Sequence, residues 1–234
     1  MATMIHPRDL RRIGHIARSR RIHYNAGVGS DFKKRDRFGE KAKGEGFSAR
    51  SVYKLEELDK KYHLLKPGHR VVDIGASPGS WMQYTAKIVL PSGYLLGLDL
   101  NEITAPLPQA ALRVQMDILR AKPEDFAALG ATPGSIDVVL SDTSPATTGI
   151  KVTDRARSLE LVQMGYEAAK VLLKKRGAYV FKVFVSNDYQ AFEKTLKPAF
   201  ERVLAQRPDA VRSGSEERYI LCLGFKGAAD ARGG

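Results

Sequence analysis

The stretch that most constrains the fold is residues 71–81, VVDIGASPGSW. Two β-branched residues lead into Asp73, and Gly75, Pro78 and Gly79 follow at once. A buried strand that stops at an acid and a glycine, with a helix beginning immediately, predicts the first βα turn of a nucleotide-binding α/β sheet. Glycines there let the backbone approach a ligand closely, and the N–H groups of the helix start point into the same space. We therefore predict a cofactor site in this turn.

Strands alternate with helices along the rest of the chain, which predicts an α/β fold with a mainly parallel sheet. The predicted strands cover residues 70–74, 94–100, 112–116, 135–142, 177–185, 201–208 and 218–225. The predicted helices cover residues 49–62 with Ser48 as the N-cap, 79–89, 123–129, a long segment through 159–172, and 188–200. No helix separates the last two strands, which indicates an antiparallel hairpin at one edge. We expect a Rossmann-like fold with a seven-stranded, mainly parallel sheet and helices on both of its faces.

Charge is concentrated at the N-terminus. The net charge is +12, and residues 1–50 hold thirteen Lys and Arg against five Asp and Glu. We expect residues 1–47 to be a basic, partly flexible arm, with a short helix over 8–21 and a loop over 25–46. Binding to nucleic acid, a solvated tail and a targeting segment all fit this composition. Residues 48–226 are the expected domain, and the small, polar residues 227–234 the expected disordered tail.

The sequence also indicates the cellular compartment of the protein. No apolar run approaches the roughly 20 residues that span a bilayer, and no signal-peptide core is visible. We therefore expect a soluble, cytoplasmic protein with no membrane partner. The histidines and the single cysteine, Cys222, lack the spacing of metal ligands, so no metal site is expected.

Acidic residues end the first four predicted strands: Asp73, Asp99, Asp117 and Asp142. Any one of them could be a turn residue, but ligands of doubly wound sheets bind at these strand ends. The turn reads D-x-G-x-x-P-G and not G-x-G-x-x-G, which argues against a dinucleotide. An acid before the glycine suits a cofactor with an amino group, such as S-adenosylmethionine, and Asp99 suits the hydroxyls of its ribose.

Lys182 lies within the apolar strand AYVFKVFV. A lysine there is costly to bury unless it is paired or faces a cleft. A buried lysine beside another cation can lose its proton near neutral pH, which makes Lys182 a candidate general base. A lysine whose ammonium group reaches solvent from a sheet edge is the alternative.

Taken together, the segments GFSARSVYKLEEL, VVDIGASPGSWMQY, LDL, LSDTSP, FKVF and SEERYILCLGF resemble the FtsJ-like ribose 2′-O-methyltransferases. The resemblance covers about residues 45–226. The family carries a Lys-Asp-Lys-Glu tetrad, which matches Lys54, Asp142, Lys182 and Glu217. Its cofactor positions match residues on the predicted strand ends and the glycine turn: Asp73, Gly75, Gly79, Trp81, Asp99, Asp117 and Asp142.

The resemblance implies S-adenosylmethionine as cofactor and methyl transfer to a ribose 2′-hydroxyl of RNA. The expected substrate is a uridine of 23S ribosomal RNA within the large ribosomal subunit, and the expected enzyme is a monomer. A transfer RNA or an mRNA cap as substrate, or a non-catalytic RNA-binding assembly factor, stays open. The chain departs from the family pattern at Ser80, where a glycine is usual, and at Ser144, in TSPATTG.

Overall fold

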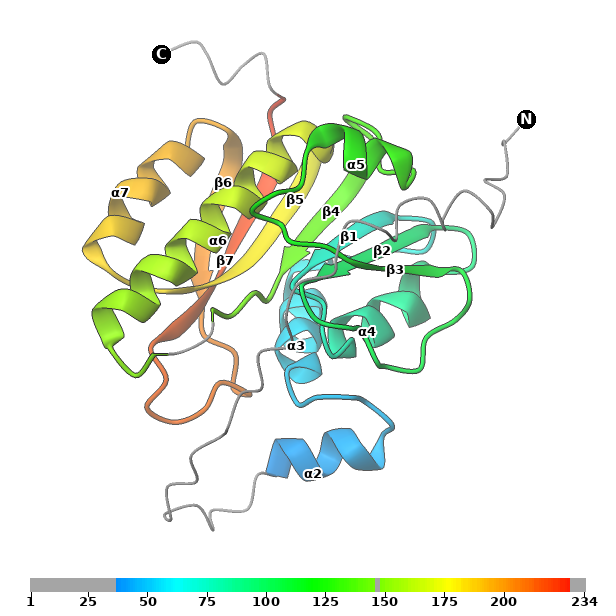
Figure 1. The fold of residues 1–234 in the computed structure, drawn as a ribbon, viewed down its shortest axis with the longest axis horizontal. Coiled ribbons are helices and arrows are strands. Elements are labelled where there is room, and N and C mark those ends of the chain that lie inside the picture. Colours follow the sequence, from blue (N-terminus) through cyan, green and yellow to red (C-terminus); the bar gives the residue numbers. More distant parts are fainter. Residues whose placement is uncertain (1–36, 146–147, 228–234) are drawn as a thin grey trace. The chain divides into compact units, whose positions relative to one another are not determined.

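The computed structural model describes residues 37–145 and 148–227. A sheet of seven strands lies at its centre, in the order β3-β2-β1-β4-β5-β7-β6 (Figure 1). The strands are β1 (Arg70–Ile74), β2 (Tyr94–Asp99), β3 (Ala111–Gln115), β4 (Ile136–Ser141), β5 (Leu173–Phe184), β6 (Phe200–Gln206) and β7 (Glu217–Phe225). Strands β3, β2, β1, β4 and β5 are parallel, and β7 is antiparallel to both of its neighbours. The predicted fold class is thus confirmed, with β7 inserted between β5 and the edge strand β6.

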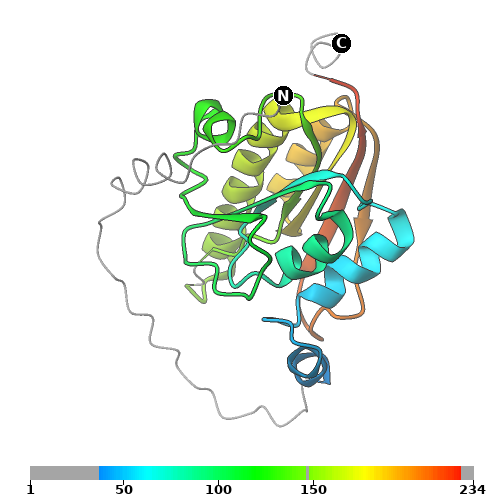
Figure 2. The same ribbon diagram turned by 90° about the vertical axis from the view of Figure 1, so that its right-hand side faces the viewer.

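Helices cover both faces of the sheet (Figures 1 and 2). The helices are α2 (Arg37–Gly44), α3 (Val52–Tyr62), α4 (Ser80–Val89), α5 (Pro123–Ala128), α6 (Lys151–Leu172) and α7 (Asn187–Leu196). Because successive strand residues point to opposite faces, Val71 packs toward α3 and α4, whereas Val72 packs toward α5, α6 and α7. Both faces are therefore apolar, as a parallel sheet requires.

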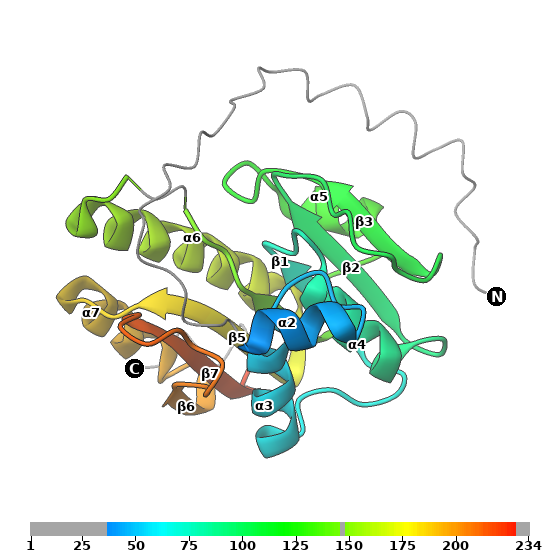
Figure 3. The ribbon, with the colours of Figure 1, turned by 90° about the horizontal axis from the view of Figure 1, so that it is seen from below.

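Helix α2 replaces part of the predicted loop over residues 25–46, so that prediction is wrong for residues 37–44. Its sequence, RFGEKAKG, carries few apolar side chains, and its contacts come from Tyr53 of α3. The ring of Phe38 lies 5.6 Å from that of Tyr53, and Ala42 is buried beside it. Figure 3 shows α2 lying next to α3 and α4. Tertiary packing, rather than helix propensity, accounts for this helix.

Three predicted boundaries are also wrong. Helix α3 has Ser51, not Ser48, as its N-cap, and the Ser48 N–H donates instead to Gln83 Oε1 of α4 (2.8 Å). Strand β5 starts at Leu173, four residues before the predicted start. Helix α7 ends at Leu196, so that β6 begins at Phe200.

The predicted helix over residues 8–21, the arm up to residue 36 and the tail 228–234 lie outside the described residues. Within the described ranges, no helix is long and apolar enough to span a bilayer. Cys222 is a buried free thiol in β7.

Candidate active site

The glycine turn after β1 brings the backbone close to neighbouring loops. Gly75 has φ of +76° and Gly79 has φ of +119°, a region that favours glycine. A Cβ on Gly75 would lie 2.6 Å from Thr143 Cγ2, and one on Gly79 would clash with Ala105. The amides of Gly75 and Ala76 both donate to the carbonyl of Leu98 at the end of β2 (2.8 and 3.1 Å). A side chain at Gly75 or Gly79 would therefore clash with a neighbouring loop of the protein.

Asp73 is a fully buried carboxylate in β1. Neither of its side-chain oxygens has a hydrogen-bond partner among the described residues. Burial, and then the negative charges of Asp142 and Asp99, raise the pKa of Asp73 well above its ordinary value. A buried, unpaired acid is costly to the fold and therefore points to a ligand that pairs with it. A cationic amino group fits this position, which is the feature that S-adenosylmethionine would supply.

Asp99 and Asp117 lie at the ends of neighbouring strands. The oxygens of Asp99 accept the N–H groups of Ser77 (2.9 Å) and Asn101 (2.7 Å), which fixes the carboxylate. Asp117 accepts the N–H of Leu119 (3.0 Å). Each oxygen keeps a second lone pair, so both acids can still accept hydroxyl groups from a ligand.

The structure brings the four tetrad residues together as two ion pairs. Lys54, from the first turn of α3, donates to Glu217 Oε1 at the start of β7 (2.5 Å). Lys182, two residues before the end of β5, has its Nζ 3.0 Å from Asp142 Oδ1 and 3.1 Å from the Asp142 carbonyl oxygen. Strand β5 is flanked by β4 and β7, so Lys182 is not the edge lysine of the alternative prediction.

Tyr219 joins the two pairs, and the sequence analysis missed it. It lies opposite Lys182 in the β5–β7 register and donates its hydroxyl to Asp142 Oδ1 (2.9 Å). Lys54 Nζ lies 5.3 Å from the centre of its ring. Burial, and then the charge of Asp142, raise the pKa of Tyr219 well above its ordinary value, so its hydroxyl remains a donor. Its two-residue spacing from Glu217, which places both on one face of β7, was the available signal.

Ser144 is a second residue that the sequence analysis did not place in the site. Its Oγ accepts a hydrogen bond from Lys182 Nζ. Three oxygen atoms therefore surround Lys182 Nζ: the carbonyl and Oδ1 of Asp142, and Oγ of Ser144. The position was noted from sequence only as a departure from the family pattern.

Trp81 packs against Tyr219 and so supports the site. It is buried, its indole N–H donates to the Ser51 carbonyl (2.8 Å), and its ring lies 5.9 Å from that of Tyr219. These contacts tie α4 to α3 and β7. The described residues contain no group of three or more His, Cys, Asp or Glu side chains that could hold a metal.

The chain is similar to known proteins of one family. The sequence profile of the FtsJ-like methyltransferases matches residues 47–225. The chain is 43% identical over 196 residues to a Bdellovibrio bacteriovorus protein named ribosomal RNA large subunit methyltransferase E, covering 83% of this chain and 99% of the relative. A Sorangium cellulosum protein of the same name is 42% identical over 197 residues, covering 84% and 91% of the two chains.

A solved structure is similar as well. It is the crystal structure of a Plasmodium falciparum protein described as a ribosomal RNA methyltransferase, with a TM-score of 0.67 and 27% identity. The match covers 77% of this chain and 100% of the other. The profile match extends from the start of the α3 segment to the end of β7 and includes every residue of the two ion pairs. The chain therefore belongs to the FtsJ-like methyltransferase family.

Proposed function

We propose that this protein transfers a methyl group from S-adenosylmethionine to a ribose 2′-hydroxyl of large-subunit ribosomal RNA, at a uridine of 23S RNA. The observation that carries the proposal is the convergence of Lys54, Asp142, Lys182 and Glu217 from four separate segments. An acceptor hydroxyl is a weak nucleophile, and these groups supply both a base and a fixed positive charge beside it.

The residues of the glycine turn fit the cofactor. Asp73 would pair with its amino group, because its two buried oxygens have no partner among the described residues. Asp99 would accept its ribose hydroxyls, and Asp117, on the adjacent strand end, would contact its base. The cofactor supplies an electrophilic methyl group on a sulfonium centre. Its position beside the tetrad would give much of the rate enhancement through proximity.

Lys182 is the proposed base. Lys182 in its neutral form would take the proton of the 2′-hydroxyl as that oxygen gains the methyl group and the bond from the methyl carbon to the sulfonium sulfur breaks. Asp142, 3.0 Å away, would stabilise the ammonium group that forms. Tyr219 holds Asp142 in place through its hydroxyl. Lys54 stabilises the developing negative charge on the 2′-oxygen, and Glu217 fixes the position of Lys54.

Ribosomal RNA as the substrate is supported by the names of the relatives and by the charge of the chain. The two relatives at 42–43% identity carry the name ribosomal RNA large subunit methyltransferase E. A net charge of +12 suits an RNA substrate and would be unusual for an enzyme of small molecules.

The test is Lys182→Ala in methyl transfer from labelled S-adenosylmethionine to large-subunit RNA of a strain that lacks this gene. We expect kcat to fall by about 10²–10⁴-fold, the usual effect of a general base. Cofactor affinity, measured by calorimetry, should stay within a few-fold of wild type. Lys194→Ala, an exposed lysine on α7, is the matched control and should keep full activity. Full activity of Lys182→Ala would exclude the base assignment, and no transfer by the wild-type protein would favour an assembly factor.

A further inference from the structure

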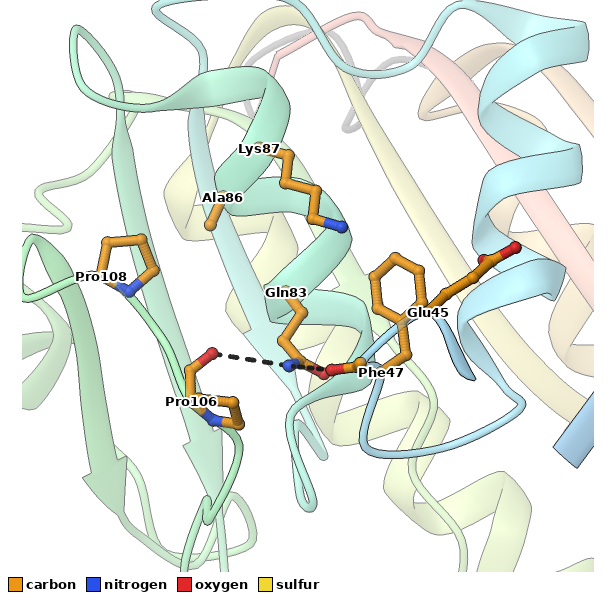
Figure 4. A pocket seen from close by; sticks show the side chains of 8 residues that line it. Glu45, Phe47, Gln83, Ala86, Lys87, Pro106 and Pro108 are labelled. Carbon is orange, nitrogen blue, oxygen red and sulfur yellow. Dashed lines mark hydrogen bonds between the residues drawn. The ribbon is translucent and has the colours of Figure 1, made fainter. Parts of the chain in front are cut away.

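A slot separate from the candidate active site lies on the outer face of α4 (Figure 4). It is a cavity of about 340 Å³ between the loop before α3 and the loop after β2. Figure 4 shows the ring of Phe47 on one side and Pro106 and Pro108 on the other, with Gln83 and Lys87 between them. None of its lining residues belongs to the tetrad or to the proposed cofactor set. The proposed methyl-transfer site therefore does not account for the slot.

The walls of the slot are held by hydrogen bonds. Gln83 is buried, and its Oε1 accepts the N–H of Ser48 (2.8 Å) while its Nε2 donates to the carbonyl of Gly46 (3.1 Å). Nε2 also faces the carbonyl of Pro106 at 3.5 Å. Phe47 is fixed by its ring contact with Tyr53, 6.4 Å between centres and edge-on. The slot is therefore preformed, as ligand sites usually are.

The chemistry of the slot suits a flat ring that carries a negative charge. The Phe47 ring and the two prolines give the slot apolar walls, which suit a planar group. Lys87 Nζ lies 4.1 Å from the centre of the Phe47 ring, so a base that stacks on this ring would displace the ammonium group, which can then pair with the phosphate. The acid at the slot, Glu45, is already engaged by the hydroxyl of Tyr53 (2.9 Å) and by Lys41 (3.7 Å). A nucleotide combines a stacking base with an anionic phosphate.

We propose that this slot binds one nucleotide of the RNA substrate, with its base between Phe47 and the prolines and its phosphate on Lys87. The inference rests on the proposed RNA substrate and adds a subsite to it. Phe47 precedes Lys54 by seven residues, a span of at most about 25 Å. The Ser51 and Ser80 hydroxyls, 2.8 Å apart, join the α3 and α4 segments between the slot and the tetrad. The bound nucleotide is thus a few positions from the methylated ribose, close enough to set substrate choice.

The test measures binding of a fluorescein-labelled, single-stranded fragment of large-subunit RNA by anisotropy at several salt concentrations. Phe47→Ala should weaken binding about 5-fold to 100-fold, the usual effect of losing one stacked base. Phe47→Trp should retain binding, because a larger ring still stacks. Lys87→Glu should weaken binding and lower the slope of log K against log salt by about one.

Two controls are needed. One shows whether a variant loses affinity because it no longer folds, and the other shows whether the effect of Lys87→Glu comes from its position or only from the change in net charge. Lys194→Glu makes the same change of charge on exposed α7 and should have a smaller effect than Lys87→Glu. Thermal unfolding of each variant checks the fold. Three results would each overturn the proposed nucleotide subsite. They are wild-type RNA affinity in Phe47→Ala, a loss of RNA affinity in Phe47→Trp equal to that in Phe47→Ala, and equal effects of Lys87→Glu and Lys194→Glu. RNA that binds through the slot without being methylated would uphold the subsite and refute only the proposed function.

Discussion

Replacing Asp73 by Asn should stabilise the protein without cofactor and abolish cofactor binding. The Asp73 carboxylate is fully buried and has no hydrogen-bond partner among the described residues. A buried, uncompensated ion costs several kcal/mol, whereas an unsatisfied amide of the same shape costs about 1–3 kcal/mol. The difference predicts a gain on the order of 2–3 kcal/mol in the free energy of unfolding. For a domain of this size that is a rise of about 4–12 °C in Tm.

The gain in the free energy of unfolding from Asp73→Asn should depend on pH. The pKa of Asp73 is raised in the folded protein by burial and by the charges of Asp142 and Asp99, so the folded state binds this proton more tightly than the unfolded state. Asp73 does not destabilise the wild-type protein at pH values below the pKa that its carboxyl has in the unfolded chain. The destabilisation grows as the pH rises above that value and is complete above the pKa of Asp73 in the folded protein. The difference in Tm between the variant and wild type should therefore be larger at pH 8 than at pH 5.

Calorimetric unfolding with and without cofactor measures both effects. At a hundredfold excess over Kd, S-adenosylmethionine should stabilise wild type by about 2.7 kcal/mol and the variant not at all. Asp73→Glu keeps the charge and is the control for shape. A variant that is less stable than wild type at pH 8 without cofactor, or that binds the cofactor as tightly, would refute the assignment of Asp73 as a destabilising, ligand-pairing acid.

Four further predictions concern the site and the arm. Tyr219→Phe removes the donor to Asp142 and should lower kcat about 10-fold to 100-fold, with cofactor affinity unchanged by calorimetry. Ser144→Ala should lower kcat up to about tenfold with an unchanged KM for RNA, and Ser144→Thr should restore it; a change in KM alone would rule out this role. Gly75→Ala should lower the free energy of unfolding by about 2–4 kcal/mol in a denaturant titration, because its φ is positive and a Cβ would clash. Removing residues 1–36 should weaken RNA binding and reduce its salt slope, and an unchanged slope would exclude the arm from the RNA contact.

The strands and the cofactor turn could be predicted from sequence because their signals are local. Asp73, Gly75 and Gly79 belong to one short turn. A Cβ at either glycine would clash with a neighbouring loop, so the structure shows why glycine is required at these two positions. Acids at successive strand ends meet because parallel strands share one carboxyl edge. The apolar strand around Lys182 indicated a lysine that is paired or faces a cleft, and in the structure Lys182 is buried and paired with Asp142.

The rest of the site depends on contacts between distant segments. Tyr219 sits in the apolar run YILCLGF, where a buried tyrosine reads as core, and only the β5–β7 register places it opposite Lys182. The contact of Ser144 with Lys182 joins residues 38 apart in the chain. Helix α2 was missed because its sequence is mostly charged and glycine-rich, and its stability comes from Tyr53. Such contacts join segments that are far apart in the sequence, so no single local pattern identifies them.

The central claim is that the methyl group reaches a ribose 2′-oxygen of large-subunit RNA, and alkaline hydrolysis tests it most directly. RNA from a strain that lacks this gene is methylated by the purified protein with labelled S-adenosylmethionine and then hydrolysed with alkali. A 2′-O-methyl group removes the hydroxyl that alkaline cleavage needs, so we predict that the label is found in an alkali-resistant dinucleotide that contains uridine. Label in mononucleotides, as from a methylated base, would contradict the account.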